Sequence, residues 1–120
     1  MVRRRSTLLL ASLIAALAFV GAALAADFFA GTLAVGASAQ SGYDSAGARW
    51  RTVGAADKNP QVGGATVSRI AFIDSGGGWS CSALSSGNHS CTLTSPNYQK
   101  KGYCRNVGTQ SFYVRCYVQT

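Results

Sequence analysis

The stretch YQKKGYCRNVGTQSFYVRCYVQT, Tyr98 to Thr120, predicts the fold of this chain. From Ser111 to Val118 the side chains alternate, which is typical of a half-buried β-strand. One face of this strand holds Phe112, Val114, Cys116 and Val118, and the other holds Tyr113, Arg115 and Tyr117. The preceding segment, residues 98–105, leads into the turn residues 106–109. The pattern predicts an antiparallel hairpin.

A disulfide across this hairpin, from Cys104 to Cys116, creates a candidate binding face. It places two arginines opposite each other and two tyrosines opposite each other, although facing like charges destabilise a strand pair. We therefore expect this face to bind something anionic or aromatic. The alternative interpretation is an ordinary solvated surface. The candidate binding residues are Lys101, Tyr103, Arg105, Tyr113, Arg115 and Tyr117.

The four cysteines, Cys81, Cys91, Cys104 and Cys116, predict two disulfides in an exported chain. Three pairings are possible. We favour Cys81–Cys91 with Cys104–Cys116, because each bond then closes a local hairpin. The Cys81–Cys91 bond would close a hairpin formed by residues 79–84 and 90–94. In that hairpin, Trp79 is expected to face Leu93 and to share a face with the disulfide. No Cys-x-x-Cys pair is present, which disfavours a zinc site and a thiol-redox site.

The N-terminus has the pattern of a secretory signal peptide. Arg3, Arg4 and Arg5 precede an apolar run from Leu8 to Ala26, and Ala23-Leu24-Ala25 offers a small-x-small cleavage site. We expect residues 1–25 to be removed, leaving a secreted, extracellular or periplasmic protein with no integral membrane span. An uncleaved anchor is the alternative, because the run approaches the length that spans a bilayer.

Removal of residues 1–25 from the 120 leaves 95, enough for one small domain. Removal of the three leader arginines from the eleven basic residues leaves eight against four aspartates, a net charge of +4. No acidic residue follows Asp74. The positive charge favours an anionic polymer, the cell envelope or a secreted or surface protein as the partner. Nucleic acid is a less expected partner in the extracellular space.

The remaining chain predicts an all-β domain. Residues 26–48 are rich in alanine, glycine and serine and are expected to form a mobile lead segment. The domain itself is assigned to residues 49–120, with a first strand at Arg49–Val53 and another at Ala65–Ile73, and with turn residues between them. The spacing of turn signals predicts a small antiparallel β-sandwich or meander, held by the two disulfides.

Catalytic chemistry has little support in the sequence. The four aspartates are scattered, and His89, the only histidine, lies at an expected turn, where we expect an exposed imidazole. No cofactor or metal site is predicted. We expect a non-catalytic binding protein, with an antimicrobial or antagonistic role as one form of it. The alternative is an inhibitor of a secreted protease or amylase, acting through residues 85–88 and 106–110. A small secreted ribonuclease or hydrolase is the less favoured enzyme.

Overall fold

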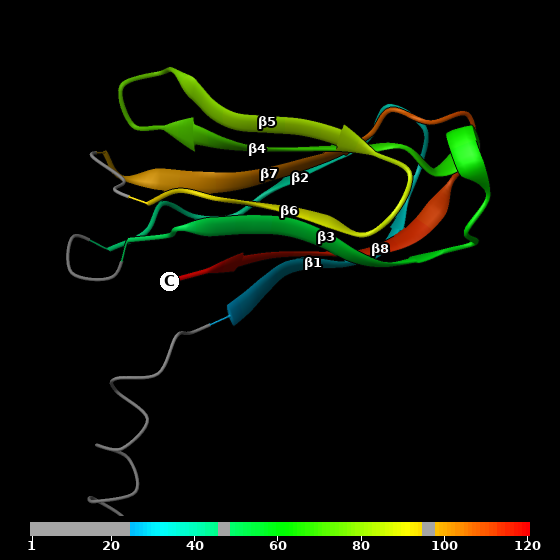
Figure 1. Ribbon diagram of the computed structural model, residues 1–120, viewed down its shortest axis with the longest axis horizontal. Coiled ribbons are helices and arrows are strands. Elements are labelled where there is room, and N and C mark those ends of the chain that lie inside the picture. Colours follow the sequence, from blue (N-terminus) through cyan, green and yellow to red (C-terminus); the bar gives the residue numbers. More distant parts are fainter. Residues whose placement is uncertain (1–24, 46–48, 95–97) are drawn as a thin grey trace, which may run out of the picture.

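The computed structural model describes residues 25–45, 49–94 and 98–120 (Figure 1). The predicted signal peptide therefore lies outside the described residues, except for Ala25. The elements are β1 (Ala25–Leu33), β2 (Ser38–Gln40), β3 (Thr52–Asn59), η1 (Gly63–Thr66), β4 (Ser68–Asp74), β5 (Trp79–Ser85), β6 (His89–Thr92), β7 (Lys100–Asn106) and β8 (Phe112–Gln119). In the described part of the chain, no helix has the length and apolar character needed to cross a membrane.

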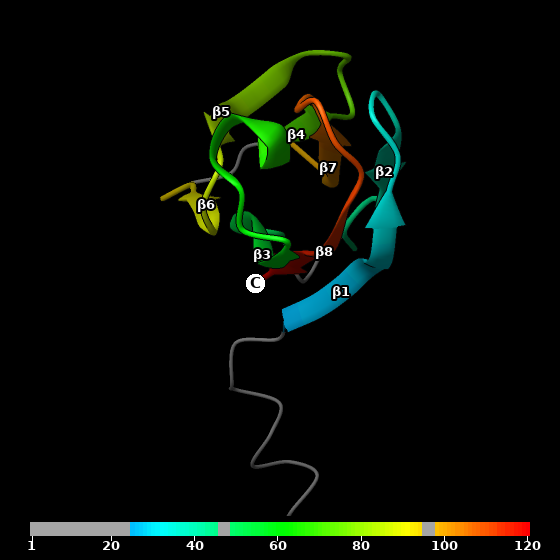
Figure 2. The same ribbon diagram turned by 90° about the vertical axis from the view of Figure 1, so that its right-hand side faces the viewer.

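The strands form two four-stranded antiparallel sheets. Sheet I has the order β1-β8-β3-β6, and sheet II has the order β2-β7-β4-β5. Sheet II is the upper layer in Figure 1 and sheet I the lower one, and the end-on view in Figure 2 shows the two layers facing each other. The prediction of a small all-β sandwich is confirmed.

The core lies between the two sheets and follows the alternation of the strands. The predicted inward set of β8 is buried, and it meets inward side chains of β3, β4 and β7. The two sheets approach each other closely at Gly102, which has no side chain. A Cβ at this position would lie 2.5 Å from Val118. The buried apolar cluster consists of Leu33, Val53, Ala55, Ile70, Phe72, Cys104, Phe112, Val114, Cys116 and Val118.

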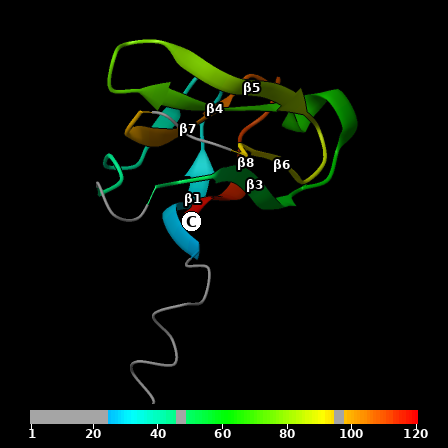
Figure 3. The same ribbon diagram turned by 60° about the vertical axis from the view of Figure 1, so that its left-hand side comes forward.

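The two predicted hairpins are wrong, because in each case the two strands belong to different sheets. β7 lies in sheet II and β8 in sheet I, and β5 and β6 are separated in the same way. Each connection crosses from one layer to the other, as the yellow-green chain between β5 and β6 shows in Figure 3. Alternation reveals which side chains point inward, but it does not reveal whether the next strand joins the same sheet or the opposite one.

The predicted disulfide pairing is confirmed, and both bonds join the two sheets. Cys81 of β5 is bonded to Cys91 of β6, with 5.8 Å between their Cα atoms. Cys104 of β7 is bonded to Cys116 of β8, with 6.5 Å between their Cα atoms. The first bond closes the edge of the sandwich, whereas the second lies in the buried core. The described part of the chain contains no free cysteine.

The expected mobile lead segment includes two strands of the sandwich. β1 pairs with β8 from Ala25 to Leu33, and β2 pairs with β7. Phe28 and Phe29 pack against the core, which Leu33 completes. The low-complexity composition suggested little to bury, but these three apolar side chains and the ladder to β8 hold the segment in place. Residues 46–48 of that expected segment lie outside the described residues.

Candidate functional site

The six predicted binding residues do not form one face. Because Cys104 and Cys116 point into the core, their neighbours in the chain point outward from two different sheets. Lys101, Tyr103 and Arg105 lie on the outer side of sheet II, and Tyr113, Arg115 and Tyr117 lie on the outer side of sheet I. The expected opposition of Arg105 to Arg115 and of Tyr103 to Tyr117 is therefore wrong.

Two residues of the sheet I triplet, Arg115 and Tyr117, are occupied by contacts within the protein, whereas Tyr113 is 41% exposed. Arg115 forms ion pairs with Asp57, at 3.0 Å, and with Asp27, at 3.1 Å. The hydrogen bond that Arg115 donates to Asp57 and the negative charge of Asp27 raise the pKa of Arg115. Tyr117 lies against Gly54, where a Cβ would stand 2.5 Å from its ring. Two carboxylates surround the single arginine, so this face does not concentrate positive charge.

The sheet II triplet instead joins residues of β4 and β5. Arg105 pairs with Arg69 of β4, and Tyr103 forms an edge-to-face contact with Trp79 of β5, with ring centroids 4.8 Å apart. The ammonium group of Lys101 lies 5.1 Å from the centre of the Tyr43 ring. We name this outer surface of sheet II the cationic face. It consists of Tyr43, Arg69, Trp79, Lys101, Tyr103 and Arg105.

Strand pairing arranges the cationic face in rows across the sheet. Trp79, Ile73 and Lys101 form the first row, and Leu84, Arg69 and Arg105 form the third. Tyr103 and Ala71 lie between them, and Ala71 is fully buried although it points outward. The first and third rows are four residues apart along β4, a separation of about 13 Å.

A β-bulge in β5 places Trp79 on this face. The pairing of β4 with β5 shifts between Ile70 and Phe72, and Cys81 has a φ of 61°. The extra residue puts Trp79 on the outer side while Cys81 still reaches its partner in the other sheet. Trp79 is 52% exposed. The expectation that Trp79 shares a face with the disulfide is wrong, because simple alternation does not include the bulge.

The two facing arginines are each held in position by a neutral acceptor. Arg69 Nη1 donates a hydrogen bond to Ser82 Oγ at 2.6 Å, and Arg105 Nε donates one to the carbonyl oxygen of Gly36 at 3.1 Å. Each guanidinium retains further N–H groups for a ligand. This pair is the like-charge pair across two strands that the sequence suggested, but Arg69 takes the place of Arg115.

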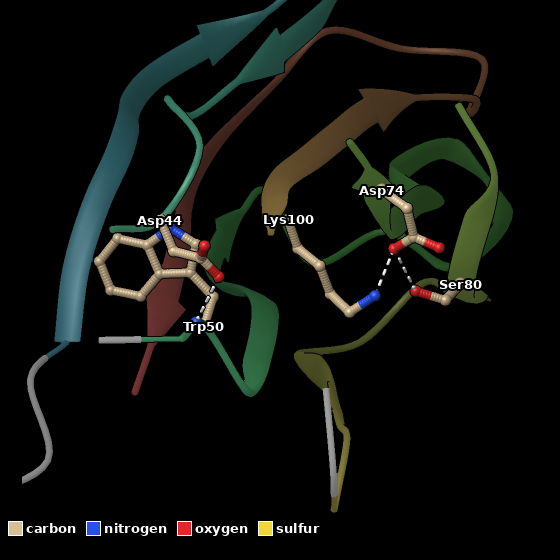
Figure 4. A network of polar contacts seen from close by, with 5 residues as sticks. All are labelled: Asp44, Trp50, Asp74, Ser80 and Lys100. Atoms are coloured by element: carbon tan, nitrogen blue, oxygen red, sulfur yellow. Dashed lines mark hydrogen bonds and ion pairs between the residues drawn. The ribbon is translucent and has the colours of Figure 1, made fainter. Parts of the chain in front are cut away.

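None of the four aspartate side chains is paired with a cation of the cationic face. Asp27 and Asp57 pair with Arg115. Figure 4 shows the other two: Asp74 accepts hydrogen bonds from Lys100 and Ser80, and Asp44 accepts one from the backbone N–H of Trp50 at 2.9 Å. Among the described residues, Arg69, Lys101 and Arg105 are thus not paired with an aspartate.

Sequence reasoning missed Arg69, Trp79 and Tyr43. Two signals were present: Arg69 interrupts the apolar pattern of its strand, and Trp79 follows a run of three glycines. Neither signal identifies the neighbouring strand, which brings these residues beside Tyr103.

His89 is not the exposed imidazole that the sequence predicted. It is half-buried at the start of β6, and neither ring nitrogen has a partner with hydrogen-bond geometry. Desolvation and the charge of Lys58 lower its pKa. No group of three histidine, cysteine or acidic side chains suited to a metal ion occurs in residues 25–45, 49–94 and 98–120.

The loop after β7 lies flat against the body of the protein. Asn106 Nδ2 donates hydrogen bonds to the carbonyl oxygens of Leu33 and Gln110, and the N–H of Val107 donates to the carbonyl oxygen of Val67. A Cβ on Gly108 would lie 2.2 Å from the carbonyl oxygen of Ala65. These contacts hold the loop against the body of the protein at Asn106 and Gly108, while Val107, Thr109 and Gln110 are exposed.

Comparisons of the chain with protein-family models, curated proteins and solved structures gave no match. The candidate site accordingly rests on the geometry and charge of the cationic face.

Proposed function

We propose that this is an exported, non-catalytic binding protein that holds an anionic polymer on the cationic face. The observation that carries the proposal is a group of three cations on the outer side of sheet II that are not paired with an aspartate. Among the described residues, the side chains of all four aspartates instead contact Arg115, the buried Lys100 or the backbone N–H of Trp50. A polymer with repeated negative charges gains several weak contacts on such a surface at once.

The rigidity of the face supports binding. Sheet II is antiparallel, is joined to sheet I by two disulfides, and holds Arg69 and Arg105 through hydrogen bonds to Ser82 and Gly36. Side chains that are already oriented lose less conformational entropy when a ligand binds. Two disulfides also suit an oxidising extracellular compartment.

The test is binding of residues 26–120 to polygalacturonate and to polyphosphate at low salt. We expect measurable affinity for at least one polymer, which decreases with salt. Replacement of both Arg69 and Arg105 by glutamine is expected to weaken binding about tenfold. The control replaces Arg51 and Arg115 by glutamine, which changes the net charge equally on other surfaces.

Equal weakening in both double variants would show that net charge, not the cationic face, controls binding. If neither polymer binds, the proposal is rejected. Inhibition of a secreted hydrolase stays an alternative prediction, and an assay of purified proteases and amylases tests it.

A further inference from the structure

We infer that the polymer held by the cationic face is a carboxylated polysaccharide, with a sugar ring stacked on Trp79 and a carboxylate bound between Arg69 and Arg105. This inference rests on the proposed function and assigns its ligand class. It follows from the combination, on the outer side of one sheet, of a half-exposed indole and a separate pair of guanidinium groups.

Trp79 is braced as a stacking platform. The edge-to-face contact with Tyr103 supports the indole on one side, and Tyr103 is itself only 7% exposed. The opposing position on β4 is the partly buried Ile73, and Lys101 follows in the same row. An indole held in this way offers a flat apolar surface to the C–H groups of a sugar ring. A polymer of phosphate alone has no group that uses this surface.

The arginine pair suits a carboxylate. Arg69 and Arg105 face each other across β4 and β7, and their hydrogen bonds to Ser82 and Gly36 leave other N–H groups available. Guanidinium groups bind carboxylates through parallel N–H···O bonds. A carboxylate between them also removes the repulsion of the two like charges.

The separation of the two subsites favours a saccharide over a nucleic acid. About 13 Å along β4 lies between the Trp79 row and the arginine row. The described surface between them presents Tyr103 and Ala71, both buried, so it offers no exposed ring on the way from Trp79 to the arginine pair. The other exposed ring of the face is Tyr43, which lies beside Lys101 and under its ammonium group. Single-stranded nucleic acids are bound by successive stacking platforms along a continuous basic groove. A carboxylated saccharide chain instead binds through one sugar ring stacked on the indole and one carboxylate a few sugar rings farther along the chain.

The experiment measures the affinities of residues 26–120 for polygalacturonate, polyphosphate and an oligothymidylate, each with the wild-type chain and with Trp79→Ala. We expect Trp79→Ala to weaken polygalacturonate binding about tenfold and to leave polyphosphate binding unchanged. Trp79→Tyr keeps an aromatic platform and is expected to restore most of the affinity. Circular dichroism and thermal unfolding of each variant confirm that the sandwich is intact.

The other outcomes separate the inference from the proposed function. Binding of polygalacturonate that is insensitive to Trp79→Ala, or binding of polyphosphate alone, overturns the inference and leaves the anionic-polymer proposal standing. Tighter binding of the oligothymidylate, weakened by Trp79→Ala, identifies a nucleic acid as the ligand and also overturns it. If none of the three polymers binds, both the inference and the proposed function are rejected.

Discussion

Lys58 is a lysine in the interior of the sandwich. It is only 1% exposed, and its Nζ donates a hydrogen bond to the carbonyl oxygen of Ser85 at 2.6 Å. Desolvation lowers its pKa to about 8. Its inward direction comes from an irregularity in β3, where Asp57 has a φ of 55° and the pairing with β8 shifts. The same irregularity turns Asp57 outward to Arg115.

The charge of Lys58 acts on His89. Desolvation lowers the pKa of His89, the positive charge of Lys58 lowers it further, and the nearby backbone groups of Ala83 and Gly87 act in the opposite direction. Because this pKa is depressed in the folded protein, the unfolded chain binds more protons once the pH falls below about 6.5. The contribution of His89 to stability is therefore lost as the pH falls from about 6.5 through its folded-state pKa.

Replacement of Lys58 by methionine is expected to raise the pKa of His89, because the nearby positive charge is removed. His89 is the only histidine, so an NMR titration of its ring resonances measures the change directly. The control is Lys101→Met, which removes the same charge from the outer side of sheet II. An unchanged or lower pKa of His89 in Lys58→Met would contradict the expected interaction.

Consecutive strands of this protein mostly face each other across the core. Among the strands of the described residues, only β4 and β5 follow each other in the chain and also pair in one sheet. The alternation of β8 correctly predicted its inward residues, because a period of two belongs to the strand itself. The hairpin prediction was wrong because the partner of a strand is chosen by non-local packing. Half of the candidate face moved to the opposite side of the molecule for this reason.

The two disulfides are expected to differ in their contribution to stability. Their sequence separations are 10 and 12 residues, so loop closure stabilises the protein by about 3 kcal/mol in each case. Cys104 and Cys116 are also fully buried, whereas Cys81 and Cys91 are half-buried. The double variant Cys104→Ala with Cys116→Ala is expected to lose roughly 1–2 kcal/mol more than Cys81→Ala with Cys91→Ala.

Urea unfolding of both double variants and of the wild-type chain measures this difference. Equal destabilisation would mean that loop closure alone sets the contribution, and that the buried sulfur atoms add nothing.

The whole sandwich depends on its N-terminal strands. β1 is paired with β8 along its length, and Phe28, Phe29 and Leu33 join the core. Burial of a large apolar side chain contributes about 1.5–3 kcal/mol. The sum for three such residues is comparable to the total stability of a small domain, which is about 5–15 kcal/mol.

A chain of residues 49–120, the domain expected from composition, is accordingly predicted not to fold. A chain of residues 26–120 is the control and is expected to unfold cooperatively. Thermal and urea unfolding, each followed by circular dichroism, distinguish the two. A cooperative transition in residues 49–120 would show that β1 and β2 are accessory.

The sequence by itself determined the all-β class, the inward face of β8 and the charge of the chain, and it favoured the disulfide pairing that the structure has. These features depend on local alternation and on composition. Tertiary structure alone decided that β7 and β8 lie in different sheets, that Trp79 joins Tyr103, and that Lys58 points inward. The reason is physical: strand partners and bulges are selected by contacts between residues far apart in the chain, and one extra residue in a strand reverses the direction of its neighbours.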